Sequence, residues 1–202
     1  MTRRSGWTIP ALADAYLAGG ARFIQIRSKD AASGLFLSMC EDVVARARKE
    51  GAVVIVNDRA DIAKVSGADG VHVGQDDLDP ASVRTILGSA AIVGLSTHSP
   101  DQVRQASTMA VDYIAVGPVF DTSTKKTGYR QAGISFVAGA AEILEHAQCA
   151  KPIVAIGGIT LERASEVIRA GASSVAVISD LLSTGNPETR VRDYLRALSE
   201  IK

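Results

Sequence analysis

Tyr113-Ile114-Ala115-Val116-Gly117-Pro118-Val119-Phe120 begins as an apolar run and turns sharply at a glycine–proline pair. A continuously apolar run of this length is typical of a parallel strand that is covered on both faces. The loop that follows, Asp121-Thr122-Ser123-Thr124-Lys125-Lys126, carries hydroxyl groups two residues apart and then two ammonium groups. Hydroxyls donate hydrogen bonds to phosphate oxygens, and lysine adds a mobile positive charge. Since ligands of parallel α/β folds bind where strands end, the sequence predicts an anion site here.

Six further β-branched, apolar runs resemble this one, and helical patterns separate most of them. The seven expected strands are Arg22–Arg27, Ala52–Asp58, Asp69–Gly74, Ala91–Thr97, Tyr113–Pro118, Pro152–Gly158 and Ser174–Ser179. Alternating strands and helices leave two architectures, a (β/α)8 TIM barrel or a doubly wound open sheet. No Gly-x-Gly-x-x-Gly motif follows the first run, which argues against a dinucleotide-binding fold. Ile156-Gly157-Gly158-Ile159 and Ile178-Ser179 favour the barrel, whose last two strand loops commonly bind phosphate.

The first strand of an eight-stranded barrel is missing from this pattern or is truncated. A helical pattern over Pro10–Leu17 precedes the first apolar run, and Met1–Gly6 resembles the end of a strand–helix loop rather than a strand. An open barrel would expose unpaired strand edges. We therefore expect that the start codon has been assigned too late, rather than that the protein truly has a barrel of seven strands.

The chain of 202 residues is expected to form one barrel domain spanning 1–202. Its 22 basic and 22 acidic residues cancel, so nothing in the net charge indicates nucleic acid or a membrane surface. Cys40 and Cys149 lack metal-ligand spacing and are expected to be reduced, which fits a cytoplasmic protein. Met1–Gly6 lacks the apolar core of a signal peptide, and no apolar run is long enough to span a bilayer. The sequence leaves open whether the protein is a homo-oligomer.

Polar side chains gather at the end of the first run. Two-residue alternation places Gln25, Arg27 and Lys29 on one side of the strand. The alternative is a solvated strand end with no ligand. Three polar groups converging where a barrel opens favour a site for an anion.

The second and third runs end in carboxylates. Asn57 and Asp58 close the second run, and Asp76 and Asp77 follow the third. Asp58 alone is equally explained as a helix N-cap, and aspartate-rich loops are often only turns. Carboxylates on adjacent strand ends, with substrate phosphate and water, are also how proteins hold Mg²⁺.

Histidine and serine positions add weaker signals. His72 lies inside a strand, and we expect a core histidine bonded to the backbone rather than a catalytic one. Ser96 is a plausible ligand donor at the end of the fourth run, whereas His98 is expected to be structural. Gly157-Gly158 allows close approach of the backbone, so that amides there and at Ser179 would bind a second phosphate.

The ordered set of these motifs resembles the thiamine-phosphate synthase family. The matching segments are Gln25-x-Arg27-x-Lys29, Val56-Asn57-Asp58, His72-Val73-Gly74-Gln75-Asp76-Asp77, Gly94-Leu95-Ser96-x-His98, Gly117-Pro118-Val119-Phe120, Thr122-x-Thr124-Lys125-Lys126, Ile156-Gly157-Gly158-Ile159 and Ile178-Ser179. Each motif is weak alone, but their order from about residue 20 to 180 is specific. The chain departs from the family pattern at Ser28, where the family usually has glutamate.

The resemblance implies a (β/α)8 barrel that joins hydroxymethylpyrimidine pyrophosphate to thiazole phosphate, with Mg²⁺ as cofactor. It implies that Arg27, Lys29 and Lys125 are catalytic through their contact with the pyrophosphate, and that Asp58 and Asp77 hold Mg²⁺. The implied substrate-binding residues are Gln25, Arg27, Lys29, Asn57, Ser96, Thr122, Thr124, Lys125, Gly158, Ile178 and Ser179. The loop Thr127–Arg130 has no assigned role.

Two alternatives remain at this point. A thiazole tautomerase shares the barrel and the thiazole phosphate site, but it should not need the aspartates or the lysine loop, and it uses a histidine where this chain has Pro118. An inactive barrel would bind thiamine precursors without releasing pyrophosphate. Asp58, Asp77 and Lys125 favour the synthase over the tautomerase.

Overall fold

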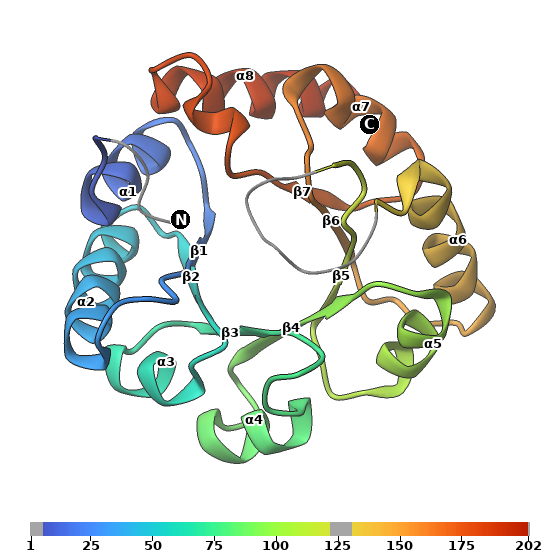
Figure 1. The fold of residues 1–202 in the computed structure, drawn as a ribbon, viewed down its shortest axis with the longest axis horizontal. Helices are drawn as coiled ribbons and strands as arrows, with labels where there is room; N and C mark the ends of the chain where they lie inside the picture. Colours follow the sequence, from blue (N-terminus) through green and yellow to red (C-terminus); the bar gives the residue numbers. More distant parts are fainter. Residues whose placement is uncertain (1–5, 122–130, 202) are drawn as a thin grey trace.

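A computed structural model describes residues 6–121 and 131–201 of the chain. Strands and helices alternate along these residues, and the helices surround the strands as an outer ring (Figure 1). The strands are β1 (Phe23–Ile26), β2 (Val53–Asn57), β3 (Gly70–Val73), β4 (Ile92–Thr97), β5 (Tyr113–Val116), β6 (Ile153–Ile156) and β7 (Ser174–Ala176). The helices are α1 (Ile9–Ala18), α2 (Ser33–Lys49), α3 (Ala60–Ser66), α4 (Pro80–Leu87), α5 (Pro100–Thr108), α6 (Gly133–His146), α7 (Leu161–Arg169), α8 (Pro187–Ser199) and the short 3₁₀-helix η1 (Asp180–Leu182).

The seven strands form one parallel sheet in the order of the sequence, from β1 to β7. Every strand lies within the run expected for it, and the barrel-like α/β class is confirmed. In the described part of the chain no strand precedes α1, and Trp7 makes only an isolated β-bridge. Among these same residues β1 and β7 are not paired with each other, so each is an edge of the sheet. As expected, the described sheet has seven strands and no strand before α1.

The helical ring closes even though the sheet does not. Helices α1 and α8 pack side by side (Figure 1), and the Arg192 Nη2 donates to the carbonyl oxygen of Ala18 at 3.2 Å. Gly19 permits this approach, because a Cβ there would lie 2.6 Å from the carbonyl oxygen of Glu188 and 2.7 Å from the Val191 Cβ. The first and last helices therefore hold the ends of the sheet in one body.

Helix starts follow the expected capping pattern. The side chains of Asp79, Ser99 and Asn186 each accept a hydrogen bond from a backbone N–H of the helix that follows, and a proline stands next in each case. These caps set where the strand–helix loops end, and hence which residues remain in the loops at the carboxyl edge of the sheet.

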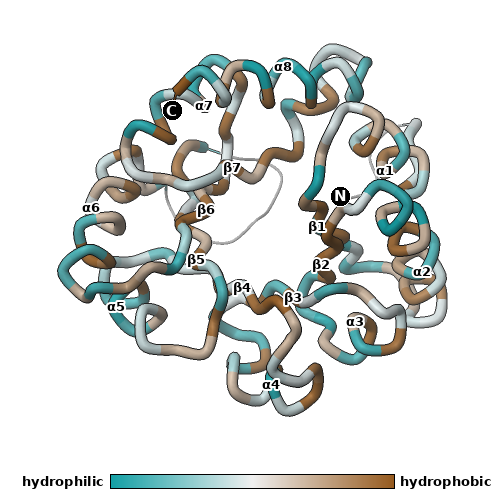
Figure 2. Tube along the Cα trace, turned by 180° about the vertical axis from the view of Figure 1, so that it is seen from behind, coloured by the Kyte–Doolittle hydropathy of each residue, from teal (hydrophilic) through white to brown (hydrophobic). Residues whose placement is uncertain are grey.

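The strands have two faces with different roles. Ile24 and Ile26 of β1 and Val54 and Val56 of β2 belong to the apolar core between sheet and helices. The alternate residues, such as Gln25, therefore point into the barrel interior. Figure 2 shows the strands as mostly hydrophobic and the outer helices as alternating between the two colours. No helix among the described residues has the length and apolar character needed to cross a membrane.

Both cysteines are free thiols, as the sequence predicts, and they should differ in reactivity. Cys40 is fully buried in α2, and burial raises the pKa of its thiol to about 12. At pH 8 only about 10⁻⁴ of this thiol would be thiolate, the nucleophilic form. We expect an aromatic disulfide reagent to modify the half-buried Cys149 promptly and Cys40 only after unfolding. Two fast-reacting thiols in the native protein would contradict this burial.

Candidate active site at the carboxyl edge of the strands

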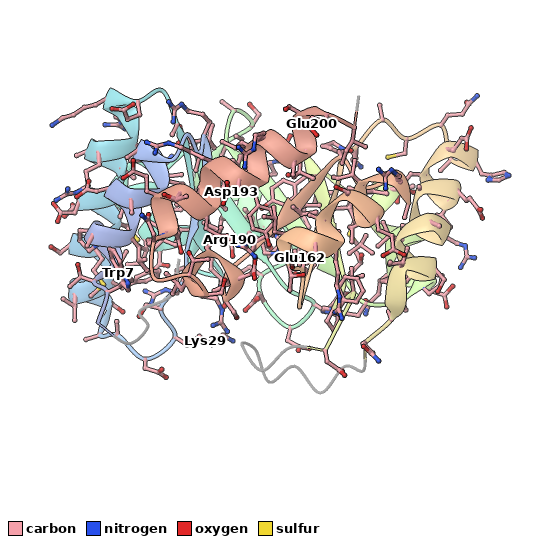
Figure 3. All side chains as sticks on the ribbon, turned by 90° about the horizontal axis from the view of Figure 1, so that it is seen from above. Trp7, Lys29, Glu162, Arg190, Asp193 and Glu200 are labelled. Carbon is pink, nitrogen blue, oxygen red and sulfur yellow. The ribbon has the colours of Figure 1, made fainter. Side chains whose placement is uncertain are left out.

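The expected site residues that the structure describes lie in the second halves of the strands or in the loops after them. Lys29 follows β1, and Figure 3 shows it at one edge of the molecule, with Glu200, just after α8, at the opposite edge. Trp7, just before α1, lies on the same side as Lys29 (Figure 3). The strand–helix loops thus gather at one end of the barrel, where ligands bind in this architecture.

A lysine just after β1 approaches a carboxylate just after β2, and an arginine directly follows β1. The Lys29 Nζ lies 3.9 Å from the Asp58 Oδ2, and the Asp58 side chain is only 24% exposed. Arg27 is half-buried, and its Nε is buried with no hydrogen-bond partner among the described residues. A buried N–H without an acceptor costs about 1–3 kcal/mol. An anionic oxygen supplied by a ligand would satisfy it.

Asp58 is held in an unusual backbone conformation. Its φ is 64°, in the left-handed region that non-glycine residues seldom adopt, with Asn and Asp the most tolerant. The Asp58 N–H donates to the carbonyl oxygen of His72 at 2.8 Å, which ties the end of β2 to β3. The expected use as an N-cap is not seen, because Arg59 occupies the N-cap position of α3 and no side-chain cap bond forms there.

The second expected metal ligand lies in the loop after β3. The Asp77 Oδ2 accepts a hydrogen bond of 2.8 Å from the Gly74 N–H, and Asp76 and Asp77 are both exposed. The buried Asn57 is in register with His72, so the ends of β2 and β3 are neighbours. Within the described ranges no group of three or more His, Cys, Asp or Glu side chains is arranged to hold a metal ion. Proteins nevertheless often bind Mg²⁺ with only one or two carboxylates, and substrate phosphates and water supply the other ligands.

A buried hydrogen-bond network crosses the barrel interior. His72 on β3 lies 2.9 Å through Nδ1 from the Tyr113 hydroxyl and 2.8 Å through Nε2 from the Ser96 Oγ. Tyr113 is also hydrogen-bonded to the side chain of Gln25. His72 is buried as expected, but its two ring nitrogens contact side-chain hydroxyl groups, whereas bonds to the backbone were expected. Two expected ligand residues, Gln25 and Ser96, are joined by this network.

Tyr113 belongs to this network, although no role for its side chain was expected from the sequence. Its ring occupies the space that a side chain at Gly94, its register partner on β4, would fill. It packs edge-on against Phe23 and stacks on His72, with ring centroids 5.7 and 5.5 Å apart. Burial raises the pKa of Tyr113 above its usual value, so the phenol stays neutral. The available signal was alternation, because Ile114 and Val116 face the core and Tyr113 must then face the interior.

The loops after β5 and β6 pack tightly against each other. Val119 N–H donates to the carbonyl oxygen of Ile156 at 2.9 Å, and Phe120 N–H to that of Gly157 at 3.0 Å. Gly158 has a φ of 62°, and a Cβ added there would lie 2.8 Å from the Phe120 Cβ and still closer to the carbonyl oxygen of Asp121. Only glycine fits this position.

Replacing Gly158 should therefore destabilise the protein. We expect Gly158→Ala to lower the free energy of unfolding by about 2–4 kcal/mol, since the left-handed φ and the overpacking each cost roughly 1–3 kcal/mol. Gly139 in α6 is the matched control, because a Cβ there meets nothing within 4 Å. Gly139→Ala should be neutral or stabilising, and chemical denaturation measures both variants. Equal stability of the two variants would contradict the packing described here.

The remaining expected residues fall into two groups. Ile178 and Ser179 are exposed in the segment between β7 and η1. Thr122, Thr124 and Lys125 of the anion loop lie outside the described residues, as does Thr127–Arg130. His98 fits its expected structural role, since its Nδ1 lies 2.5 Å from the carbonyl oxygen of Gly117.

Both the sequence and the fold of the chain resemble those of known proteins. Residues 2–181 match the family model for thiamine monophosphate synthase. The chain is 42% identical to the thiamine-phosphate synthase of Thermus thermophilus, over 95% of this chain and 91% of that protein. It is 41% identical to the thiamine-phosphate synthase of Lawsonia intracellularis, over 90% and 82% respectively. The solved structure of thiamine phosphate pyrophosphorylase from Pyrococcus furiosus superposes with a TM-score of 0.89 at 28% identity, covering 99% of this chain and 94% of that one.

Proposed function

Because the chain belongs to the thiamine-phosphate synthase family, we propose that it joins hydroxymethylpyrimidine pyrophosphate to thiazole phosphate, giving thiamine phosphate and pyrophosphate. The observation that carries the assignment to this site is the meeting of β1 and β2. There Arg27 offers a buried Nε without an acceptor in the described structure, beside Lys29 and Asp58. That edge is suited to a pyrophosphate.

The proposed reaction mainly requires stabilisation of the charge that develops on the leaving pyrophosphate and on the pyrimidine. The bond between the pyrimidine methylene carbon and the pyrophosphate oxygen breaks, and the oxygen leaves with the electron pair. The aminopyrimidine ring stabilises the resulting cation, and the thiazole nitrogen donates its lone pair to form the new C–N bond. No proton has to be removed, so neither a nucleophilic side chain nor a general base is needed. Positioning and electrostatics then supply the catalysis.

Each residue has a place in this scheme. Arg27 and Lys29 contact the leaving pyrophosphate, together with Lys125. Gln25, Asn57 and Ser96 bind the pyrimidine pyrophosphate, supported by the buried His72–Tyr113 network that connects Gln25 to Ser96. Thiazole phosphate is bound by Thr122, Thr124, Gly158, Ile178 and Ser179.

Mg²⁺ fits the residues present. Asp58 and Asp77 would hold it as hard oxygen ligands from neighbouring strand ends, and pyrophosphate oxygens would complete the shell. When bound, the ion supplies positive charge against the leaving group. Lys29, 3.9 Å from the Asp58 carboxylate, adds to the same positive field.

The tautomerase alternative is disfavoured by the same residues. Such an isomerase would use a histidine where this chain has Pro118, and it would not need Asp58, Asp77 or Lys125. The relatives that match most of the chain at about 40% identity carry the name of the synthase. We further propose a cytoplasmic location, which the free thiols of Cys40 and Cys149 support.

The test is an assay with both substrates and Mg²⁺ that follows pyrophosphate release together with thiamine phosphate formation. We expect the two products in equal amounts, and expect both to disappear with EDTA. Binding of the precursors without pyrophosphate release would identify an inactive binding barrel. Isomerisation of the thiazole alone would identify the tautomerase.

A further inference from the structure

A carboxylate directly after Ser179 accepts hydrogen bonds from three residues, two in α8 and one at the start of α7. The Asp180 Oδ2 accepts from the Arg190 Nε at 3.0 Å, the Arg190 Nη2 at 2.8 Å and the Tyr194 hydroxyl at 2.6 Å. It also lies 3.2 Å from the Leu161 N–H at the start of α7. Only 11% of each side chain of the Asp180–Arg190 pair is exposed. A shielded pair with this many hydrogen bonds has a fixed geometry.

Tyr194 connects this carboxylate to a second loop. The hydroxyl lies 2.6 Å from the Asp180 Oδ2 and 3.4 Å from the carbonyl oxygen of Ile159, which follows Gly158. Burial raises the pKa of Tyr194, and the bond to Asp180 adds to the rise, so the hydroxyl remains a donor at working pH. The Arg190 guanidinium lies over the Tyr194 ring at 5.8 Å from its centroid.

The elements involved are those that flank the proposed thiazole phosphate site. Asp180 belongs to η1 after β7. Ile159 lies in the loop after β6, Leu161 begins α7, and Arg190 and Tyr194 lie in α8. Figure 3 shows Arg190 and Glu162 between α8 and α7, and the Arg190 Nη2 is 3.4 Å from the Glu162 Oε1. The cluster therefore joins the loop of Gly158 to the loop of Ser179.

We infer that Asp180, Arg190 and Tyr194 are positioning residues that set the separation between the Gly158 and Ser179 loops, and thereby the affinity for thiazole phosphate. This inference rests on the proposed function, which places that phosphate between the two loops. Backbone amides bind phosphate well only when they are held in the right geometry, since small displacements lose much of the gain. β7 is an edge strand of the described sheet, and the cluster ties the residue directly after Ser179 to α7 and α8.

The experiment compares the two substrates in each variant. Asp180→Asn removes the charge, and Tyr194→Phe removes only the hydroxyl. We expect KM for thiazole phosphate to rise about tenfold in Asp180→Asn and about threefold in Tyr194→Phe, by analogy with other losses of positioning. KM for the pyrimidine pyrophosphate and kcat should stay within about twofold, because the ends of β1–β3 are untouched. Arg190→Lys keeps the charge but loses the two-nitrogen contact, so its effect should be intermediate.

Asp193→Asn is the matched control. Asp193 lies in the same helix as Arg190, and its partner is the exposed Arg196 at 3.0 Å. This variant should leave both KM values unchanged. The inference is overturned if the Asp180 and Tyr194 variants only lower the melting temperature, or if they raise both KM values equally. The cluster would then contribute to stability alone. Should Asp180→Asn fail to fold, the KM ratio in Tyr194→Phe decides the question alone.

Failure of the proposed function would be recognised separately. It would show as a wild-type protein that forms no thiamine phosphate. The inference is then tested by equilibrium titration with thiazole phosphate. Binding that weakens in Asp180→Asn but not in Asp193→Asn supports the positioning role. No binding by wild type, or equal binding by all variants, overturns it.

Discussion

Asp58→Asn is expected to lower kcat/KM by about 10²–10³-fold, the loss typical of removing one preorganised electrostatic group, while leaving the fold intact. Asn tolerates the left-handed conformation at φ 64° as well as Asp does, so the backbone has no reason to move. The lost contact to Lys29 contributes little to stability, because the two groups are 3.9 Å apart and more than half of the Lys29 side chain is exposed. Asp58→Asn therefore tests the negative charge of Asp58 without changing the structure around it.

The neighbouring aspartates supply the comparison. Asp77→Asn should behave like Asp58→Asn, because an amide oxygen can still accept the Gly74 N–H bond while its charge is gone. Asp76→Asn is the control, since Asp76 is the adjacent exposed carboxylate and has no assigned role. We expect the first two variants, measured by initial rates over a range of Mg²⁺, to need more Mg²⁺ and the control to follow wild type. If Asp58→Asn and Asp77→Asn both kept full Mg²⁺-dependent turnover, these two aspartates would not be the metal ligands.

The strands and caps could be read from the sequence because they depend on local information. Continuous β-branched runs fixed all seven strands, and an Asp, Ser or Asn before proline fixed three helix starts. Alternation in β1 was also enough to place Gln25 and Arg27 on the interior side. The residue types at strand ends, with the family resemblance, then predicted a site at one edge of the sheet.

Contacts between distant segments could not be read in the same way. The His72–Tyr113–Ser96 network depends on the strand register that places Gly94 beside Tyr113. Which residues of neighbouring strands pair cannot be predicted from this sequence alone. Asp180 carried no signal in the sequence, because its donors Arg190 and Tyr194 lie in α8. The contact of Gly19 with α8 joins opposite ends of the chain. Such contacts exist only once the helices have packed.

Arg27→Ala is expected to separate function from stability. Its kcat/KM should fall by about 10²-fold, because the leaving pyrophosphate loses a preorganised guanidinium. Its ligand-free stability should equal or exceed that of wild type, because the variant removes a buried Nε–H that has no acceptor in the described structure, a defect that costs about 1–3 kcal/mol. Initial rates measure the first effect, and thermal unfolding without ligand measures the second. Unfolding with Mg²⁺ and inorganic pyrophosphate adds a measure of anion binding, since the stabilisation by a ligand grows with the logarithm of its concentration relative to Kd.

Two further variants make the result specific to the anion site. Arg27→Lys restores a charge but not the planar fork, so it should recover only part of the lost activity and of the stabilisation by pyrophosphate. Arg46 also has a buried Nε without a partner in the described residues, but its Nη1 contacts Asp14 on α1, away from the site. Arg46→Ala should leave the kinetics and the pyrophosphate response unchanged. If Arg27→Ala instead destabilises the ligand-free protein and responds to pyrophosphate like wild type, then Arg27 is a structural residue and the leaving group is bound elsewhere.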